Sequence, residues 1–396
     1  MTAPQIPATM QQSLSYLEEN GFITRSPSPA SLRLRELAAE YVARLKKPPR
    51  LRAVLLSGSA VVGNAGKGSD LDLQCIVKGR SEALWKTVYR SVVVDSMVTS
   101  EEDWSRSLRG ENAKYLTHTV PLYDPSGLFS RTQRRLLRSY FSQESVDREC
   151  RRVKVLVAQR RQAGLASVER GRLSEAALAL ESCFFQVCSL LIYCHKGFAS
   201  TSLLLSETAR LAKRLGRPQW TLRAMRTLRL NLPRATFLDL LHTHHHAMAV
   251  MRRRLRQHPG LVRKIQRREL PGPFGQARAI LEICSTTNAR QLRDKVLRCL
   301  ANGEKADAAL ALTYESWWIF FGLSPFFYLK NADAKASGER IAATPFHDIL
   351  TCWGGDVRRA WERIGRYHRL TRRLLRDLDA LNREILSAIV NASSEP

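Results

Sequence analysis

The stretch of sequence that decides the fold runs from residue 55 to residue 73 and reads LLSGSAVVGNAGKGSDLDL. The apolar residues at its start predict a short strand over residues 52–56. A second strand is expected over residues 71–77, where Asp70 and Asp72 alternate with leucines. Because side chains at positions i and i+2 of a strand point to the same face, the two carboxylates are expected to project together.

A third carboxylate is expected beside this pair. Asp95 interrupts the apolar strand expected over residues 91–98, where an unpaired buried carboxylate would be costly. If this strand neighbours that of Asp70 and Asp72, the three carboxylates converge. Their hard oxygen ligands favour Mg²⁺, with two ions expected and Mn²⁺ as the alternative metal. Such a set suits two-metal phosphoryl transfer, in which one ion activates the attacking hydroxyl and the other holds the triphosphate.

The turn before the aspartates is expected to bind phosphate. Gly58 allows close approach of an anion to the backbone, and Ser59 begins a predicted helix and can donate its hydroxyl to a phosphate oxygen. Lys67, in the glycine-rich linker, could reach the triphosphate. Ser69, directly before Asp70, completes the predicted nucleotide-binding set.

Gly58-Ser59, ten intervening residues, Asp70-Leu71-Asp72 and a later strand with Asp95 together resemble the DNA polymerase β-type nucleotidyltransferase superfamily. The resemblance implies Mg²⁺-dependent transfer of a nucleoside monophosphate from an NTP to an acceptor hydroxyl, with release of pyrophosphate. By this resemblance Gly58 and Ser59 would bind the NTP phosphates, and Asp70 and Asp72 would ligate both metals. Asp95 would ligate the catalytic metal and help to activate the acceptor.

The expected fold class is an α+β nucleotidyltransferase head, with a small mixed sheet and helices, followed by a mainly α-helical C-terminal body. This layout also resembles antibiotic-type nucleotidyltransferases. The expected divisions are an N-terminal arm (1–30), the catalytic domain (31–142), a helical domain (143–258) and a second helical region (259–396). A helix is predicted over residues 81–89, and long helical patterns occupy 131–163, 173–196, 201–215, 234–257, 274–301, 304–322 and 356–390.

The charge of the chain points to an anionic partner. Lys and Arg number 63 against 36 Asp and Glu, giving a formal net charge of +27, and most of the excess follows residue 140. This balance favours nucleic acid, nucleotides or an anionic membrane face. The basic runs of the chain are Arg131–Arg138, Arg151–Lys154, Arg160–Arg161, Arg252–Arg256, Arg263–Arg268, Arg358–Arg359 and Arg369–Arg376.

Three interpretations of the acceptor stay open. The basic body favours an RNA acceptor such as a tRNA end, with NTP as the donor. The head-plus-helices layout favours a small-molecule acceptor, as in antibiotic modification or natural-product biosynthesis. A third possibility is an inactive scaffold that binds nucleotide or RNA. The oligomeric state is not indicated.

Two further groups in the predicted helices have candidate roles. Glu181 has apolar neighbours at helical spacing, which can raise the pKa of a carboxyl toward that of a general base; the alternative is a structural glutamate with a satisfied partner. His242 and His246 are four residues apart, a spacing that can bind metal; the alternative is that the histidines of 242–246 are exposed or core residues.

The cysteines and the N-terminus lead us to expect a reduced, cytoplasmic protein. The chain has 8 Cys, with no C-x-x-C pair, and no signal peptide is recognised. Two apolar stretches, 183–194 and 316–329, fall short of the roughly 18–20 residues of a spanning helix, so no transmembrane segment is expected.

Overall fold

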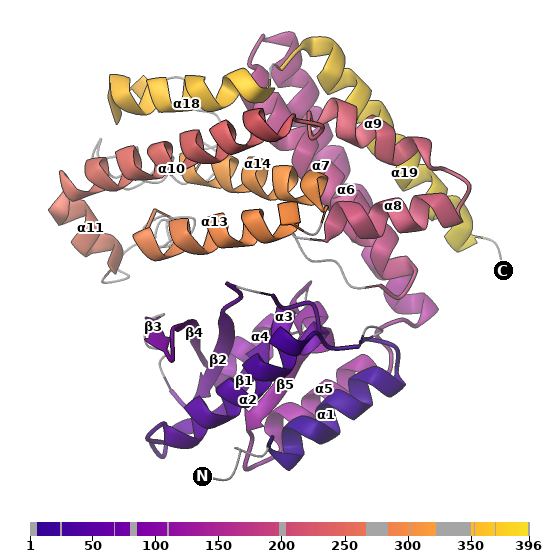
Figure 1. Cartoon of the computed structure of the whole chain (residues 1–396). Helices are drawn as coiled ribbons and strands as arrows, with labels where there is room; N and C mark the ends of the chain where they lie inside the picture. Colours follow the sequence, from indigo (N-terminus) through magenta and orange to yellow (C-terminus); the bar gives the residue numbers. More distant parts are fainter. Residues whose placement is uncertain are drawn as a thin grey trace. The chain divides into compact units, whose positions relative to one another are not determined.

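A five-stranded mixed sheet forms the centre of the N-terminal part of the computed structural model (Figure 1). The strand order is β3-β4-β2-β1-β5; β2 and β4 run parallel, and the other neighbouring strands run antiparallel. The strands are β1 (Leu51–Ser57), β2 (Leu71–Val77), β3 (Trp85–Tyr89), β4 (Val92–Ser100) and β5 (Thr119–Tyr123).

The chain divides into two compact units. The first comprises residues 1–148 and 193–198 and contains the sheet, and the second comprises residues 149–192 and 199–396. The structure describes residues 6–23, 26–66, 68–79, 85–108, 111–197, 203–266, 284–301, 303–321, 350–351, 353–368 and 370–394.

Strand register places four residues of β4, β2, β1 and β5 in one row. Asp72 of β2 lies opposite Asp95 of β4 on one side and opposite Ser57 of β1 on the other. Ser57 in turn lies opposite Thr119 of β5. Residues that lie directly opposite each other in neighbouring strands point to the same face, so this row shares one face of the sheet.

The β3–β4 hairpin differs from the helix expected over residues 81–89. Residues 85–89 form a strand paired with β4, and residues 81–84 lie outside the described part. Arg90 and Ser91 have φ of 45° and 65°, which suits a two-residue turn between twisted strands. The expectation of a helix was wrong because the β-branched and aromatic residues of this segment pair with β4.

Helices supply much of the core around the sheet. Met10, Leu14 and Leu17 of α1 are buried, so α1 belongs to the core of the first unit. Ser13 of the same helix donates a hydrogen bond of 2.6 Å to Gln133 of α5. The helices of this unit are α1 (Ala8–Glu19), α2 (Pro29–Arg44), α3 (Ser59–Val62), α4 (Glu101–Ser107), the 3₁₀ helix η1 (Glu111–His118) and α5 (Leu128–Leu137).

The α2 helix lies on the face of the sheet opposite Asp95. Tyr41 of α2 makes a ring contact with Tyr89 of β3, with centroids 5.2 Å apart. Tyr89 pairs with Val92, which shares its face with Val94. Since Asp95 follows Val94 in the same strand, its side chain points the other way. The aspartate face is therefore the less covered face, and Asp95 is half-buried whereas Val94 is fully buried.

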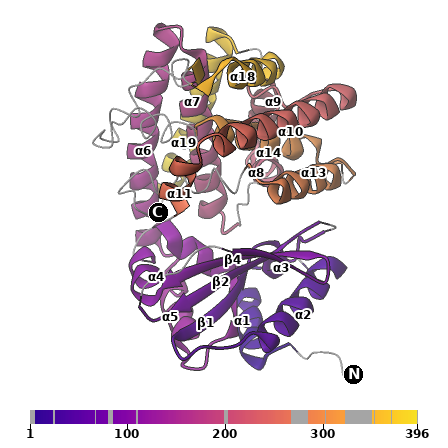
Figure 2. The ribbon, with the colours of Figure 1, turned by 90° about the vertical axis from the view of Figure 1, so that its left-hand side faces the viewer.

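The second unit consists of packed helices in the residues that are described. α10 packs against α18 (Figure 2), and α13 packs against α14 and α9 against α19 (Figure 1). The helices are α6 (Gln143–Glu169), which begins in the first unit, α7 (Leu173–Cys194), α8 (Leu204–Arg214), α9 (Gln219–Thr227), α10 (Arg234–Arg256), α11 (Pro259–Gln266), α13 (Thr286–Ala301), α14 (Lys305–Phe321), α18 (Gly355–His368) and α19 (Arg372–Ser394).

Ion pairs join helices of the second unit that are far apart in sequence. Arg161 of α6 contacts the buried Asp379 of α19 at 2.7 Å. Arg254 of α10 pairs with Asp356 of α18. Part of the arginine content of this unit therefore holds helices together.

The prediction of an α+β head followed by a mainly helical body is confirmed. Among the residues that the structure describes, one helix, α7, is long and apolar enough to cross a membrane by length and composition alone. Of its most apolar part 56% is buried within the structure, as in the central helix of a folded unit. The second apolar stretch of the sequence, 316–329, lies outside the described residues from position 322 onward.

Candidate functional site

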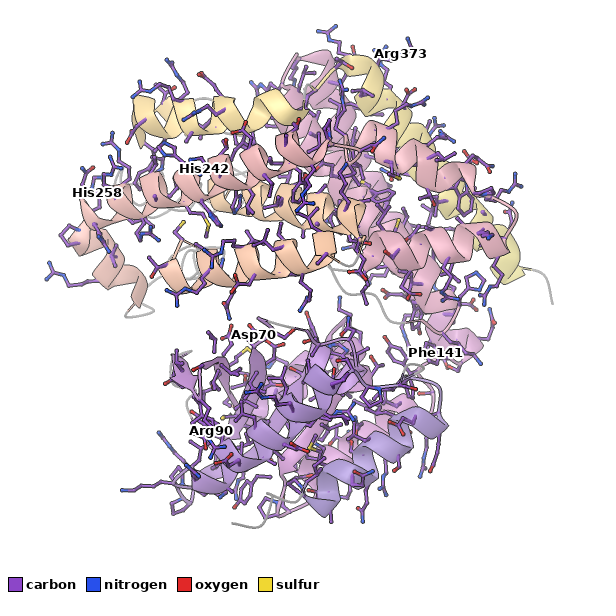
Figure 3. The ribbon with its side chains drawn as sticks, viewed as in Figure 1. Asp70, Arg90, Phe141, His242, His258 and Arg373 are labelled. Atoms are coloured by element: carbon purple, nitrogen blue, oxygen red, sulfur yellow. The ribbon has the colours of Figure 1, made fainter. Side chains whose placement is uncertain are left out.

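Three carboxylates meet at one edge of the sheet. Oxygens of Asp70, Asp72 and Asp95 all lie within 4.8 Å of one another, and all three residues are half-buried. The register of β2 and β4 brings Asp72 and Asp95 side by side. Asp70, labelled in Figure 3, directly precedes β2 and lies two residues from Asp72. The parallel pairing of β2 with β4 thus assembles acidic side chains that are 23 residues apart in the chain.

The spacing of these oxygens fits a divalent cation. Oxygen ligands at about 2.1 Å from one octahedral Mg²⁺ lie roughly 3–4 Å apart, so the cluster can close around an ion with small side-chain movements. Three carboxylates in one place repel each other, and bound cations offset that repulsion. The donor set consists of oxygens alone, which favours Mg²⁺ or Mn²⁺ over softer metals.

Gly58 packs directly against this centre. It has φ 75° and ψ −148°, a conformation that L side chains rarely adopt. A Cβ added at this position would lie 2.2 Å from Oδ2 of Asp72. Glycine is therefore required at position 58 for two reasons: the backbone conformation and the close approach to the Asp72 carboxylate. The turn that follows β1 is thereby held next to the acidic cluster.

Ser59 begins α3, which has only four residues. The segment after α3 is anchored to the N-terminus of α2. The Ser31 hydroxyl accepts a hydrogen bond of 2.9 Å from the amide of Ala65, and the Ser28 hydroxyl donates to the Ala65 carbonyl at 2.7 Å. These contacts fix the start of the linker that leads to Asp70.

Of the predicted nucleotide ligands Ser69 and Lys67, the structure describes Ser69 alone. The Ser69 hydroxyl accepts a hydrogen bond of 3.0 Å from the amide of Gly66, so it closes the turn before Asp70. Its contact with nucleotide stays a prediction. Lys67 lies outside the described residues.

Glu181 belongs to the second unit, whereas the three aspartates belong to the first. It is buried in α7, with 7% of its surface exposed, next to the buried Leu180 and Phe184. A role as general base stays a prediction.

The histidines of α10 form no metal site of three or more ligands in the described part of the chain, where the aspartate cluster alone meets that criterion. His242 and His246 are exposed (His242 is labelled in Figure 3), whereas His244 is fully buried. Burial, with a smaller effect of His245, lowers the pKa of His244 to about 3, so its imidazole is neutral at pH 7.

Sequence reasoning missed the residues that continue the row of Asp95, Asp72 and Ser57 into β5. Thr119 extends the row from Ser57, which brings the end of η1 to the same edge of the sheet. Burial and the charge of Lys114 lower the pKa of His118, the last residue of η1, to about 4. Strand β5 was not expected, so no signal in the sequence pointed to this neighbourhood.

No family model and no curated protein matches this sequence. Among solved structures, the chain is similar to a nucleotidyltransferase-like protein from Exiguobacterium sibiricum 255-15. The identity is 12% and the TM-score is 0.30, over 52% of this chain and 68% of that chain.

Proposed function

We propose that the chain is a metal-dependent nucleotidyltransferase that moves a nucleoside monophosphate from an NTP to an acceptor hydroxyl and releases pyrophosphate. One observation carries the proposal: Asp70, Asp72 and Asp95 gather within 4.8 Å, directly beside the Gly58 turn. A cation site made of carboxylates, next to a turn that an anion can approach closely, suits a metal-bound triphosphate.

In this mechanism each residue of the cluster has a defined task. Asp70 and Asp72 would hold two Mg²⁺ or Mn²⁺ ions. Asp95 would hold one of these ions and would also accept a hydrogen bond from the hydroxyl of the acceptor substrate. Two such ions, when bound, stabilise the charge on the attacking and leaving oxygens. The acceptor oxygen forms a bond to the α-phosphorus, and the bond from that phosphorus to pyrophosphate breaks. The proton of the acceptor hydroxyl would pass to the Asp95 carboxylate.

The turn residues would bind the donor. The Gly58 and Ser59 segment would contact the NTP phosphates through the backbone and the Ser59 hydroxyl, and Lys67 would neutralise the triphosphate. Ser69 would support the same contact by holding the turn before Asp70.

We propose RNA as the acceptor because exposed arginines extend over several helices of the second unit. They include Arg253 and Arg256 on α10, Arg359 on α18 and Arg373 on α19, the last labelled in Figure 3. Such a distribution suits a phosphodiester backbone better than a cationic small molecule. A small-molecule acceptor is the second candidate, and a scaffold without activity is the third.

Transfer of label tests the activity and the acceptor together. The full chain is incubated with Mg²⁺, each α-labelled NTP in turn, and a cell extract divided into RNA and small-molecule fractions. Label in RNA supports the first candidate, and label in the small-molecule fraction supports the second. The Asp70→Asn and Asp72→Asn variants must lose the label, whereas Asp103→Asn, at an exposed carboxylate of α4, must keep it. No label with any NTP overturns the proposed activity.

A further inference from the structure

A buried arginine stands behind the turn that we assign to nucleotide binding. Arg35 of α2 has only 4% of its surface exposed. Its Nε donates to the carbonyl of Ala60 at 2.9 Å, and its second guanidinium nitrogen donates to the carbonyl of Val61 at 2.7 Å. Both acceptors belong to α3, the short helix that begins at Ser59.

Burying the charged guanidinium of Arg35 costs free energy unless its hydrogen bonds are made, so its buried position requires a structural explanation. Ala60 and Val61 are themselves buried, with 1% and 0% of their surfaces exposed. Their carbonyls lie at the C-terminal end of α3, where a cation is favourable. The planar guanidinium can reach two carbonyls at once, which a lysine ammonium cannot do with the same fixed geometry.

Further contacts from the start of α2 hold the same turn. The backbone amide of Ser28 donates to the Gly63 carbonyl at 2.9 Å, and the hydroxyls of Ser28 and Ser31 bond Ala65. The hydroxyl of Ser31 also donates to the Ser59 carbonyl at 3.4 Å. The turn from Ser59 to Ala65 is thus fastened along its length to one helix.

We propose that Arg35 is a positioning residue for nucleotide binding: it holds the turn after Gly58 in the conformation that keeps Gly58 and Ser59 beside Asp72. Its role rests on the proposed function, since the turn is taken to bind the NTP phosphates. Arg35 lies on α2, which covers the opposite face of the sheet from Asp95, so it acts through the turn. The aspartates lie outside its hydrogen bonds, so metal binding in the absence of nucleotide does not depend on it.

The test compares Arg35→Met with Arg33→Met. Arg33 is an exposed arginine two residues away on the same helix, which makes it a matched control. Arg35→Met leaves two buried carbonyls without their donor, so affinity for the Mg²⁺–NTP complex, and KM in the transfer assay, is expected to weaken by about tenfold or more. The affinity for Mn²⁺ alone and the kcat at saturating NTP change much less. Arg35→Lys is expected to recover part of the loss.

Two outcomes of these assays overturn the proposal. One is a folded Arg35→Met protein that binds Mg²⁺–NTP as tightly as Arg33→Met. The other is a loss of Mn²⁺ binding equal to the loss of NTP binding, which would mean a general collapse of the site. If Arg35→Met does not fold, Ser31→Ala replaces it, with the same expected separation of nucleotide and metal affinity.

Hydrogen exchange separates this inference from the proposed function. The amides of Val61, Gly63 and Ala65 are bonded within the turn or to Ser31. They are expected to exchange faster in Arg35→Met than in Arg33→Met, while amides of β2 stay protected. Unchanged exchange at these amides refutes the positioning role even if the enzyme is active. If these amides exchange faster in Arg35→Met but the unsubstituted protein binds no NTP, Arg35 does hold the turn, and it is the proposed activity that is refuted.

Discussion

Each aspartate of the cluster is expected to be indispensable, because a metal held by three neighbouring carboxylates loses a ligand with any single substitution. Asp72→Asn and Asp95→Asn should each lower kcat for nucleotidyl transfer by about 10²-fold or more, the scale on which a lost electrostatic contact to the transition state acts. Initial rates at saturating Mg²⁺ and NTP measure this. Full activity of either variant, with Asp103→Asn as the matched control, would remove that residue from the centre.

Gly58→Ala is expected to disturb the site through contact as well as through backbone strain. The added Cβ would meet Oδ2 of Asp72 at 2.2 Å, in a conformation with positive φ. Gly21→Ala is the matched control, because Gly21 has φ 71° and open space around its Cβ. Both variants should lose about 1–3 kcal/mol of stability from strain.

Only Gly58→Ala should also weaken Mn²⁺ binding. Titration of both variants with Mn²⁺ compares their affinities for the metal. Equal Mn²⁺ affinities in Gly58→Ala and Gly21→Ala would show that a side chain placed against the Asp72 carboxylate does not disturb the metal centre.

At the residue scale the sequence was sufficient to find the three aspartates. The alternation of Asp70 and Asp72 with leucines fixes their common face, and an aspartate within an apolar strand singles out Asp95. Arg35 could not be found in this way. In sequence it is one of many arginines on a predicted helix, and its function depends on two carbonyls that only the folded chain brings near it.

At the element scale, α10 should make the second unit sensitive to acid. The pKa of buried His244 is lowered to about 3, whereas an unfolded chain binds the proton near pH 6.5. The unfolded state therefore binds more protons between these values, and the free energy of unfolding falls as the pH falls through that window. From pH 7 to pH 5 the expected loss from this one residue is about 2 kcal/mol.

Chemical denaturation at pH 7 and pH 5 measures this loss. His244→Gln should remove it, whereas His246→Gln, at an exposed position of the same helix, should retain it. An equal pH dependence in the two variants would contradict a neutral buried imidazole at position 244.

Elements with a strong periodic pattern were predictable, and those that depend on partners were not. The expected strand 71–77 matches β2, and the expected helix 173–196 contains α7. The single helix expected over 131–163 is two helices, α5 and α6, separated after Leu137. Strand β3 is extended because it pairs with β4 across the turn at Arg90 and Ser91. The residue pattern alone did not reveal this pairing.

At the scale of the whole molecule, the net charge of +27 should govern binding of the acceptor. Affinity for single-stranded RNA is expected to fall by about tenfold or more between 50 and 200 mM salt, since about three phosphate contacts are enough to give that dependence. The combined substitution of Arg253, Arg256 and Arg359 by Gln should reduce both the affinity and the salt slope. Arg44→Gln is the control, because Arg44 is paired with Glu40 within α2.

Titration of labelled RNA at several salt concentrations decides this point. RNA binding that is absent, or that does not respond to salt, would exclude an RNA acceptor and leave the small-molecule candidate.

The order of a sheet-containing head before a helical body was visible in the sequence because strand patterns end near residue 125. The acceptor was not visible, because many exposed surfaces could produce the same charge excess.

The most direct test of the central claim is to follow both ends of the NTP in one reaction. The protein is incubated with Mg²⁺, the RNA fraction, and NTP labelled at either the α- or the γ-phosphate. The account predicts that the α-label enters the acceptor while the γ-label appears as pyrophosphate in equal amount, and that Asp72→Asn or chelation of Mg²⁺ abolishes both. Entry of the γ-label into the acceptor, or full α-label transfer by Asp72→Asn, would contradict it.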